Sequence, residues 1–279
     1  MTLWFYEKQT PHLEFCTHVK KTLYTETTEF QDLKVLDTHE FGRTLVLDGA
    51  IQTTIRDEFI YHEMITHVPL FTHPNPEKVL VIGGGDGGTV REVLKHSQVK
   101  KVHLVEIDRR VVEVAKEYLP EISCAVDDPR VDIFFEDGIQ YIQKSSEKYD
   151  VVLVDSPDPV GPAVGLFSHN FYRSIYDILT ADGLFVAQTE SPFFNQELIR
   201  SVYHTIDSIF PVAMLYLISI PTYPGGAWTF TMGSKEHHPL SFSKQMTTIP
   251  TRYYTARLHR AVFVLPRFLE DLIAQGPSK

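Results

Sequence analysis

Short apolar runs alternate with amphipathic segments five times from residue 78 onward, and this alternation constrains the fold more than any other feature. Each run has the length of a buried strand, and each following segment spaces its apolar residues at helical intervals. The five runs are KVLVI, VHLVEID, VDIFFEDG, YDVVLVDS and GLFVAQ. Repeated strand–helix units predict a parallel, doubly wound α/β sheet. Two further runs, AMLYLISI and AWTFTMG, have no helical segment between them and predict an antiparallel edge.

The segments on either side of this sheet predict smaller units. Residues 1–56 lack helical periodicity, and RTLVLDGAIQTTI is a hairpin signal with Asp48 and Gly49 at the turn, so we predict a small all-β domain. Residues 57–73 carry apolar side chains at helical spacing, with Asp57 as the N-cap. We divide the chain into an N-terminal β domain at 1–56, a Rossmann-like catalytic domain at 57–240 that begins with this linking helix, and a tail at 241–279 docked on it.

Composition and charge argue against several classes of protein. The chain has 279 residues, 43% of them hydrophobic, and a formal net charge of -10, which disfavours broad binding to nucleic acid or an anionic membrane. No apolar run approaches the length that spans a bilayer, and the first residues lack the apolar core of a signal peptide. Cys16 and Cys124 have no CxxC spacing, which argues against a disulfide scaffold. We expect a soluble cytoplasmic protein.

A glycine-rich turn follows the first strand of the sheet in VLVIGGGDGGTVREVLK. Gly83, Gly85 and Gly88 satisfy the pattern G-x-G-x-x-G, in which glycine lets backbone N–H groups approach a ligand. Glu106, at the end of the next strand, is placed to accept from both hydroxyls of a ribose. Tight strand–helix packing without a ligand is the alternative. The motif alone does not separate a dinucleotide dehydrogenase from a transferase of the S-adenosyl type.

Two acidic residues favour the adenosyl ligand. Asp86 lies inside the glycine turn, where a carboxylate would repel a pyrophosphate but suits a cationic ligand. Asp137, followed by Gly138, ends the third strand, where class I methyltransferase-like folds hold an adenine amino group. No second nucleotide-binding half follows. We therefore predict a Rossmann-like sheet of the class I methyltransferase type.

The fourth strand ends in the loop DSPDPVGP, which carries Asp155 and Asp158. Ligands of an open α/β sheet bind beyond the carboxyl ends of its strands. One or two acids at strand ends could be helix caps or turn residues, but acids at successive strand ends favour a positively charged ligand. The acids expected to converge on this cleft are Asp86, Glu106, Asp137, Asp155 and Asp158.

The segment YHEMITH places His62 and His67 five residues apart. A zincin helix needs a spacing of four, so the two rings would not share a helix face, and we predict no metal site. A Tyr61–His62 pair facing the cleft is the functional alternative to a satisfied core or surface histidine.

A set of motifs occurs in a family-specific order: FGRTLVLDGAIQTTIRDEFIYHEM, VLVIGGGDGGTVREVLKH, VEID, EDG, DSPDPVGP, LF…FY and IPTYPGG. Together they resemble the spermidine synthases, a polyamine aminopropyltransferase family, from about residue 3 to at least 235. The resemblance implies transfer of the aminopropyl group of decarboxylated S-adenosylmethionine to putrescine, giving spermidine and methylthioadenosine. It also implies a homodimer or homotetramer, with decarboxylated S-adenosylmethionine as a co-substrate and no tightly bound cofactor.

The matched motifs transfer the family's site residues onto this chain, with Asp155 as the proton acceptor. The residues implied for the amine and aminopropyl groups are Gln31, Tyr61, His62, Asp86, Asp155, Asp158 and Tyr223. The residues implied for the adenosine part are Gln52, Gly83, Gly85, Asp86, Glu106, Asp137, Gly138 and Pro162. Pro157 departs from the family, which more often has Ser or Thr there, so the loop loses a hydroxyl and a backbone donor.

Three other functions stay open on the sequence alone. The same transfer to agmatine, cadaverine or spermidine would need a different pocket depth, which a sequence does not display. Glu190 would pair with the far amine of the acceptor or be a surface turn acid. A small-molecule N-methyltransferase would differ in its donor, and a non-catalytic polyamine-binding protein would not need Asp155.

Overall fold

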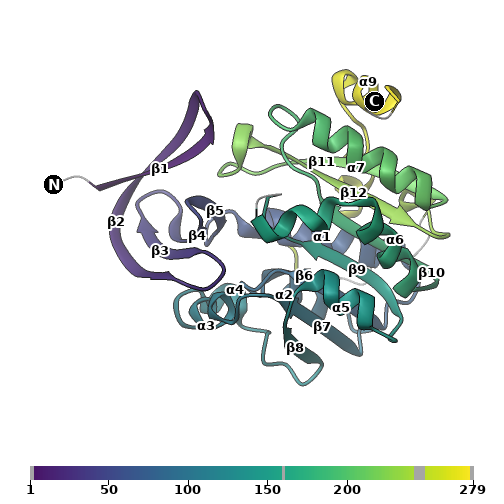
Figure 1. Cartoon of the computed structure of the whole chain (residues 1–279), viewed down its shortest axis with the longest axis horizontal. Helices are drawn as coiled ribbons and strands as arrows, with labels where there is room; N and C mark the ends of the chain where they lie inside the picture. Colours follow the sequence, from purple (N-terminus) through teal and green to yellow (C-terminus); the bar gives the residue numbers. More distant parts are fainter. Residues whose placement is uncertain (1–2, 159–160, 242–248, 277–279) are drawn as a thin grey trace.

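The computed structural model describes residues 3–158, 161–241 and 249–276, with the backbone alone at 161–162. Two β-sheets lie side by side, a smaller one at the N-terminal end and a larger one flanked by helices (Figure 1). In the described part of the chain, no helix combines the length and apolar character needed to cross a membrane.

The N-terminal sheet is an antiparallel meander in which each strand pairs with the next along the chain. Asp48 and Gly49 form the turn of the last hairpin with φ values of 49° and 83°, the left-handed conformation that a two-residue hairpin turn requires. The predicted all-β segment is confirmed. Its strands are β1 (Leu3–Thr10), β2 (Leu13–Thr27), β3 (Asp32–Thr38), β4 (Gly42–Leu47) and β5 (Ala50–Thr54).

The large sheet has the order β11-β12-β10-β9-β6-β7-β8. Strands β6 to β10 are mutually parallel, and β11 and β12 form the predicted antiparallel edge. The predicted doubly wound sheet of the class I methyltransferase type is therefore confirmed. The strands are β6 (Lys78–Gly83), β7 (Lys101–Glu106), β8 (Val131–Phe135), β9 (Tyr149–Asp155), β10 (Leu179–Gln188), β11 (Val212–Ser219) and β12 (Ala227–Ser234).

Helices cover both faces of this sheet, which explains why its strands are apolar at successive positions. In β6, Val79 and Val81 pack in the core that contains α1, whereas Leu80 and Ile82 pack in the core of the opposite face. The helices are α1 (Glu58–Thr72), α2 (Gly88–Leu94), α3 (Arg109–Tyr118), α4 (Pro120–Ser123), α5 (Gly138–Lys144), α6 (His169–Ile178), α7 (Gln196–Ile209), α8 (Ala256–Ala261) and α9 (Arg267–Ala274), and 3₁₀ turns occur at Gly161–Phe167, Pro224–Gly226 and Pro239–Ser241.

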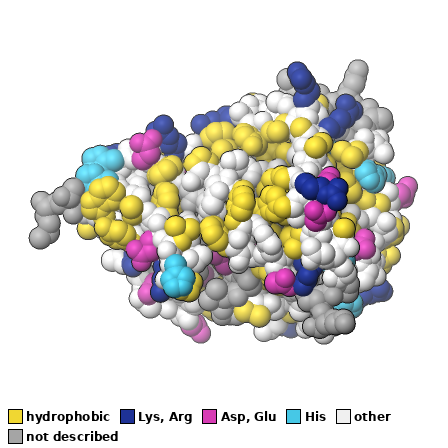
Figure 2. Space-filling model, turned by 90° about the horizontal axis from the view of Figure 1, so that it is seen from above, with side chains coloured by type: hydrophobic (Ala, Val, Ile, Leu, Met, Phe, Trp, Pro, Cys, Tyr) yellow, Lys and Arg dark blue, Asp and Glu magenta, His cyan; other side chains and the backbone are white. Residues whose placement is uncertain are grey.

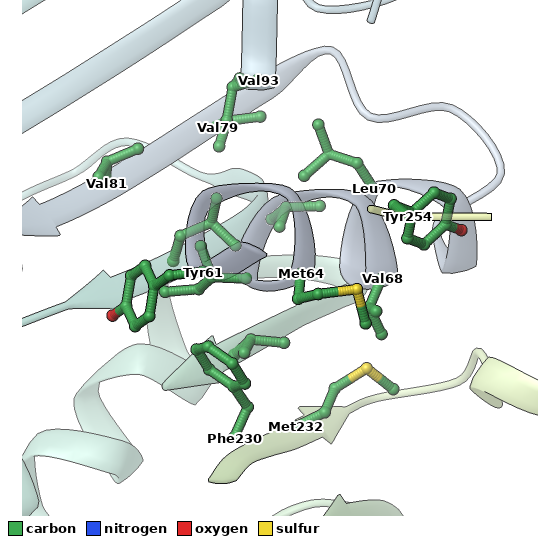
Figure 3. Packing of buried hydrophobic residues seen from close by; sticks show 14 of the residues in the cluster. Tyr61, Met64, Val68, Leu70, Val79, Val81, Val93, Phe230, Met232 and Tyr254 are labelled. Carbon is green, nitrogen blue, oxygen red and sulfur yellow. The ribbon is translucent and has the colours of Figure 1, made fainter. Parts of the chain in front are cut away.

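Helix α1 is buried on almost all sides, because it lies between the large sheet and the C-terminal segment. Met64 and Val68 point into a layer that contains Phe230 and Met232 of β12 (Figure 3). Full burial of an apolar side chain of this size stabilises the fold by about 1.5 to 3 kcal/mol. The helix therefore forms a rigid platform for the polar residues at its N-terminal end.

Asp57 occupies the N-cap position of α1, as expected, but its side chain makes no capping hydrogen bond to the helix. Its carboxylate accepts from the Thr54 hydroxyl at 2.6 Å and from the backbone N–H and hydroxyl of Thr222 at 3.1 and 2.7 Å. These three donors occupy the carboxylate. Asp57 therefore ties the start of α1 to the loop after β11 rather than to the helix itself.

The described part of the tail packs on the large sheet. Leu269 and Leu272 of α9 share an apolar cluster with Ile199 of α7 and Leu215 of β11. Glu63 of α1 accepts the backbone N–H groups of residues 252–254 at 2.7 to 2.8 Å. The division at residues 57 and 241 remains our proposed domain assignment.

Candidate active site

A cavity of about 390 Å³ opens at the carboxyl ends of the parallel strands, with walls from both sheets. Every predicted site residue whose side chain is described lies on it; the side chain of Pro162 lies outside the described residues. We call one part the Asp155 end (Tyr61, His62, Asp86, Asp155, Asp158 and Tyr223) and the other the Glu106 end (Gln31, Glu106 and Asp137).

Asp155 is the last residue of β9 and lies directly against the glycine turn after β6. A Cβ on Gly83 would be 2.1 Å from the Asp155 carbonyl oxygen, and one on Gly84 would be 2.6 Å from Oδ2 of its carboxylate. The Thr89 hydroxyl donates to Oδ2 at 2.6 Å. Burial and the charge of Asp86 raise the pKa of Asp155, so its carboxylate has an increased affinity for a proton. Sequence reasoning missed Thr89, since a lone threonine after a glycine motif carries no distinctive signal.

Asp86 and His62 form an ion pair beside Asp155. Nε2 of His62 is 3.4 Å from Oδ2 of Asp86, while Oδ1 of Asp86 accepts the Gly88 N–H at 2.8 Å. Burial alone would lower the pKa of His62, but Asp86 and Glu58 together raise it well above its ordinary value. Burial likewise acts to raise the pKa of Asp86, but the charge and hydrogen bond of His62, the Gly88 N–H and the charge of Arg91 together lower it. The pair is therefore charged at neutral pH.

Glu7 and Glu190, two further buried acids, lie near Asp158. Glu7 of β1 accepts the Ile51 N–H at 2.9 Å, and burial raises its pKa to about 7. Glu190, whose φ is 75°, accepts from the Asn195 amide at 2.8 Å, and burial together with the Asp158 charge raises its pKa to about 9. Glu190 is thus a buried acid beside the cavity wall and not a surface turn acid. Sequence reasoning missed Glu7 because only the sheet-to-sheet packing brings β1 here.

The loop after β9 is held by Gln188 of the neighbouring strand. Its side-chain amide donates to the carbonyl oxygens of Ser156 and Pro157 at 3.2 and 3.4 Å. Backbone carbonyls rather than side chains at 156 and 157 therefore hold this part of the loop, which explains how proline is accommodated at 157.

Two tyrosines line the cavity at the Asp155 end. The rings of Tyr61 and Tyr223 have their centroids 5.7 Å apart. Tyr223 donates its hydroxyl to the backbone carbonyl of Gln52 at 2.7 Å, which connects the loop after β11 to the N-terminal sheet. The aromatic walls give a long apolar substrate chain a surface to pack against.

Glu106, the last residue of β7, is satisfied by backbone donors. Its Oε2 accepts the Gly85 N–H at 3.1 Å and its Oε1 accepts the Asp108 N–H at 3.0 Å. Burial raises the pKa of Glu106 to about 7. A Cβ on Gly85 would lie 2.8 Å from Oε2, so glycine is needed there for contact with this carboxylate. Each oxygen keeps a second lone pair for a ligand hydroxyl.

Gln31 lies at the Glu106 end, although the resemblance grouped it with the amine site. Its amide donates to Asp108 at 2.9 Å, and Asp108 in turn donates its N–H to Glu106. Asp108 also caps α3. This neighbourhood favours contact of Gln31 with the same part of a ligand as Glu106.

Asp137 and Gly138 both line the cavity, and Asp137 is also a helix cap. Its Oδ1 accepts the Ile139 N–H at 2.7 Å at the start of α5. A Cβ on Gly138 would lie 2.5 Å from Ile82, so close packing on β6 requires glycine at this position. The capping bond fixes the orientation of the Asp137 carboxylate.

A group of potential metal ligands lies at the other end of the sheet, within the described residues. Asp182 is 3.6 Å from Nε2 of His73 and 3.3 Å from Nε2 of His237. The Asn75 N–H donates to Nδ1 of His73, which leaves the ring proton of neutral His73 on Nε2, the atom that would have to coordinate. This tautomer suits a contact between the Nε2–H of His73 and the Asp182 carboxylate better than metal coordination. His67 packs instead against His96 and Glu92, away from His62.

Comparison with known proteins identifies the family to which this chain belongs. Residues 58–244 match the family described as Spermine/spermidine synthase domain, and residues 3–54 match the Spermidine synthase tetramerisation domain. The chain belongs to the spermine/spermidine synthase family.

Similar proteins support this membership over the whole length. A polyamine aminopropyltransferase of Caldicellulosiruptor saccharolyticus is 59% identical over 98% of this chain and 99% of its own, and one of Bacillus mycoides is 56% identical over 98% and 100%. The crystal structure of spermidine synthase from Thermotoga maritima has a TM-score of 0.91 at 39% identity, covering 98% of this chain and 94% of its own. Another spermidine synthase, in complex with the transition state analogue AdoDATO, has a TM-score of 0.92 at 39% identity, covering 98% and 95%.

Proposed function

We propose that this protein is an aminopropyltransferase that makes spermidine and methylthioadenosine from putrescine and decarboxylated S-adenosylmethionine. The observation that supports it best is the division of one cavity into two acidic ends. Three carboxylates at the Asp155 end suit a ligand with several ammonium groups, and Glu106 suits the hydroxyls of a nucleoside. Membership of the spermine/spermidine synthase family supports the same reaction.

Asp155 acts as the proton acceptor. An amine with a pKa near 10.4 must lose a proton to be nucleophilic, which at pH 7 costs about 4 to 5 kcal/mol. The raised pKa of Asp155 brings its proton affinity closer to that of the amine, and desolvation lowers the amine pKa at the same time. Thr89 orients the carboxylate by donating to Oδ2. The sulfonium leaves as a neutral thioether and needs no acid, so alignment of nitrogen, carbon and sulfur provides much of the remaining acceleration.

Asp86 pairs with the ammonium of the aminopropyl arm and thereby selects the donor. Ordinary S-adenosylmethionine carries an additional carboxylate on this arm, which Asp86 would repel. The lowered pKa of Asp86 keeps it ionised across the neutral range, so this selection does not depend on small changes in pH.

The nucleoside of the donor occupies the Glu106 end. Glu106 accepts from the ribose hydroxyls, and Asp137 receives the adenine amino group. Gln31 assists at this end rather than at the amine, because its amide lies beside Asp108 and Glu106. The glycine turn at Gly83 and Gly85, with Gly138, lets the nucleoside approach the backbone, and Gln52 and Pro162 complete this part of the site.

The acceptor amine packs along the faces of Tyr61 and Tyr223 that line the cavity, with its far ammonium beside Asp158. Glu7 and Glu190 add negative charge here, because a nearby ammonium favours their ionised forms. A diamine of putrescine length is our first choice of acceptor. Cadaverine, agmatine and spermidine differ from it only in the length or head group that reaches this acidic end.

We also infer a homo-oligomer, dimeric or tetrameric, that works in the cytoplasm. Residues 3–54 match a domain described as a tetramerisation domain, and Figure 2 shows apolar side chains exposed at the N-terminal end. Leu3, Trp4, Tyr6 and Leu13 of the β1–β2 hairpin are 41 to 59% exposed, which a second copy of the chain would cover. Cys16 and Cys124 are exposed free thiols, as a reducing compartment allows.

The decisive experiment measures release of methylthioadenosine from decarboxylated S-adenosylmethionine with putrescine, cadaverine, agmatine and spermidine offered singly. Release with putrescine supports spermidine synthesis. Release only with another amine keeps the mechanism and changes the acceptor. Methyl transfer from ordinary S-adenosylmethionine, with no release from the decarboxylated donor, would overturn the proposal.

A further inference from the structure

Glu58, at the start of α1, contacts the active-site histidine from the side opposite the cavity. Its Oε2 lies 2.6 Å from Nδ1 of His62, and Nε2 of His62 lies 3.4 Å from Oδ2 of Asp86. The Arg91 guanidinium, from α2, donates to the same Oε2 of Glu58 at 2.8 Å. The side chains of Glu58, His62 and Asp86 are 3 to 11% exposed. A continuous series of contacts thus runs from the partly exposed Arg91 through the buried Glu58 and His62 to Asp86.

Both ring nitrogens of His62 face carboxylate oxygens, and an ionised carboxylate can only accept a hydrogen bond. Each nitrogen must therefore carry a proton if both contacts are to be favourable, which makes the ring a cation. Arg91 keeps Glu58 ionised, because a fixed positive charge at 2.8 Å favours the carboxylate form. With Glu58 and Asp86 both ionised, this geometry favours a doubly protonated ring.

The ring is also held in place by packing. A Cβ on Gly88 would lie 2.3 Å from both Cε1 and Nδ1 of His62, so the imidazole lies directly on the first turn of α2. Tyr61 contacts it edge-on, with ring centroids 5.5 Å apart. With Glu58 and Asp86 at its two nitrogens, the ring has little freedom to turn.

We propose that Glu58 is a positioning residue that holds His62 as a cation, and that this cation allows Asp86 and Asp155 to be negatively charged together inside one cavity. Without it, two neighbouring buried carboxylates would share a proton, and Asp155 would be occupied by that proton before the amine arrives. The effect on Asp155 as a proton acceptor rests on the proposed function, whereas the protonation state of His62 does not depend on it.

The charged and titratable groups around His62 come from each element packed against it. They are Glu58 and Tyr61 of α1, Asp86 of the glycine turn, Asp155 of β9, Arg91 of α2 through Glu58, and Tyr223 of the loop after β11. Tyr61 and Tyr223 stay neutral below pH 10, because burial raises the pKa of both hydroxyls well above the ordinary value. The balance of charge around the ring is therefore set by the carboxylates and Arg91.

The first test is the protonation midpoint of His62, followed by NMR in the whole, substrate-free protein with labelled histidine. We expect a midpoint well above 6.5 in the wild type and a fall of at least about one pH unit in Glu58→Gln, the smallest shift typical of losing a neighbouring opposite charge. Glu58→Asp keeps the negative charge, so its His62 midpoint should lie between those of Glu58→Gln and the wild type. A wild-type midpoint at or below 6.5 would overturn the proposal without any variant, even if Glu58→Gln failed to fold.

The second test is the pH profile of turnover for the same variants. In Glu58→Gln the acidic limb of kcat should move up by about one pH unit, giving about a tenfold loss on that limb and recovery at alkaline pH. A uniform loss at every pH would instead indicate a structural role and contradict the proposal. If the proposed reaction itself is wrong, no turnover is seen with any variant, while the His62 midpoints still decide the role of Glu58.

Glu63→Gln is the matched control. Glu63 lies on the same helix, is as buried as Glu58 and accepts backbone N–H groups of the C-terminal segment. We expect this variant to lower thermal stability while leaving the His62 midpoint and the acidic limb in place. Equal shifts in Glu58→Gln and Glu63→Gln would mean that loosening of α1, and not the Glu58 charge, controls His62.

Discussion

At the Glu106 end of the cavity each acid is held by backbone N–H groups, whereas at the Asp155 end the acids face one another and a histidine. Glu106 accepts two N–H groups, and Asp137 also accepts two, at the start of α5. Asp86 and Asp155 lie instead within each other's field and that of His62. Fixed backbone N–H groups keep a carboxylate in one orientation for binding, whereas neighbouring side-chain charges shift its pKa. The same residue type thus serves recognition at one end and chemistry at the other.

The largest effect is expected when the charge of Asp155 is removed, which tests whether the Asp155 end carries out the chemistry. We expect Asp155→Asn to lose at least about a hundredfold in kcat, the low end for a general base, with little change in donor KM. Asp150→Asn is the matched control, because Asp150 bonds two backbone N–H groups at the opposite end of the same strand. Steady-state release of methylthioadenosine measures both. Near-full turnover of Asp155→Asn at pH 7 would mean that Asp155 only binds.

The complementary change is Glu106→Gln at the binding end. Loss of hydrogen bonds to a charged acceptor costs about 1.5 to 3 kcal/mol, so donor KM should rise about ten- to a hundredfold while kcat and amine KM change little. Since the pKa of Glu106 is about 7, wild-type affinity for the donor should increase from pH 6 to pH 8 as the carboxylate ionises, and this dependence should vanish in the variant. Calorimetric titration with methylthioadenosine checks it. A drop in kcat alone would contradict the division of the cavity.

A third variant tests whether Asp86 selects the donor by charge. Asp86→Asn should reduce the preference for decarboxylated over ordinary S-adenosylmethionine by about tenfold, the value of one charged contact. The measurement is the ratio of kcat/KM for the two sulfonium donors. Asp158→Asn, at the acceptor side of the same end, should raise amine KM and leave that ratio alone. An unchanged ratio in Asp86→Asn would remove Asp86 from donor selection.

A separate prediction concerns the stability of the protein without substrates. Burial raises the pKa of Glu7 and Glu106 to about 7 and of Glu190 to about 9, so above pH 4.5 the folded protein retains protons that the unfolded chain has lost. Stability should therefore fall as pH rises from 5 to 8, by roughly 3 kcal/mol for each group raised by about two units. Melting curves at both pH values test this. Putrescine with methylthioadenosine should reduce the fall, and a Tm that rises over this range would contradict it.

Much of the fold and the location of the site could be predicted because both depend on short-range patterns. Alternating strand and helix periods predicted the parallel sheet, and the rule that ligands lie beyond the strand ends placed Asp86, Glu106 and Asp155 together. Glu58 had a local signal as well, since it precedes His62 by four residues on one helix.

Other features depend on contacts between distant segments, which no local pattern encodes. Glu7 reaches the cavity only because the two sheets pack together, and the burial of Glu190 depends on the packing around its loop. Asp57 has the sequence of a helix cap, but Thr222, far along the chain, takes its carboxylate instead. Local rules failed where a tertiary partner competed for the same side chain.

Two glycines of the turn after β6 lie against side chains of the active site, and these contacts predict how the sequence can vary in evolution. Neither Gly85 nor Gly88 has a positive φ, so the backbone would tolerate alanine at both positions. What excludes a Cβ is Glu106 at Gly85 and the ring of His62 at Gly88. Substitutions at 62 and 88 are thus expected to be inherited together: a lineage that replaces His62 with a slimmer side chain releases Gly88 to vary, while Gly85 stays invariant for as long as the acid at 106 is kept.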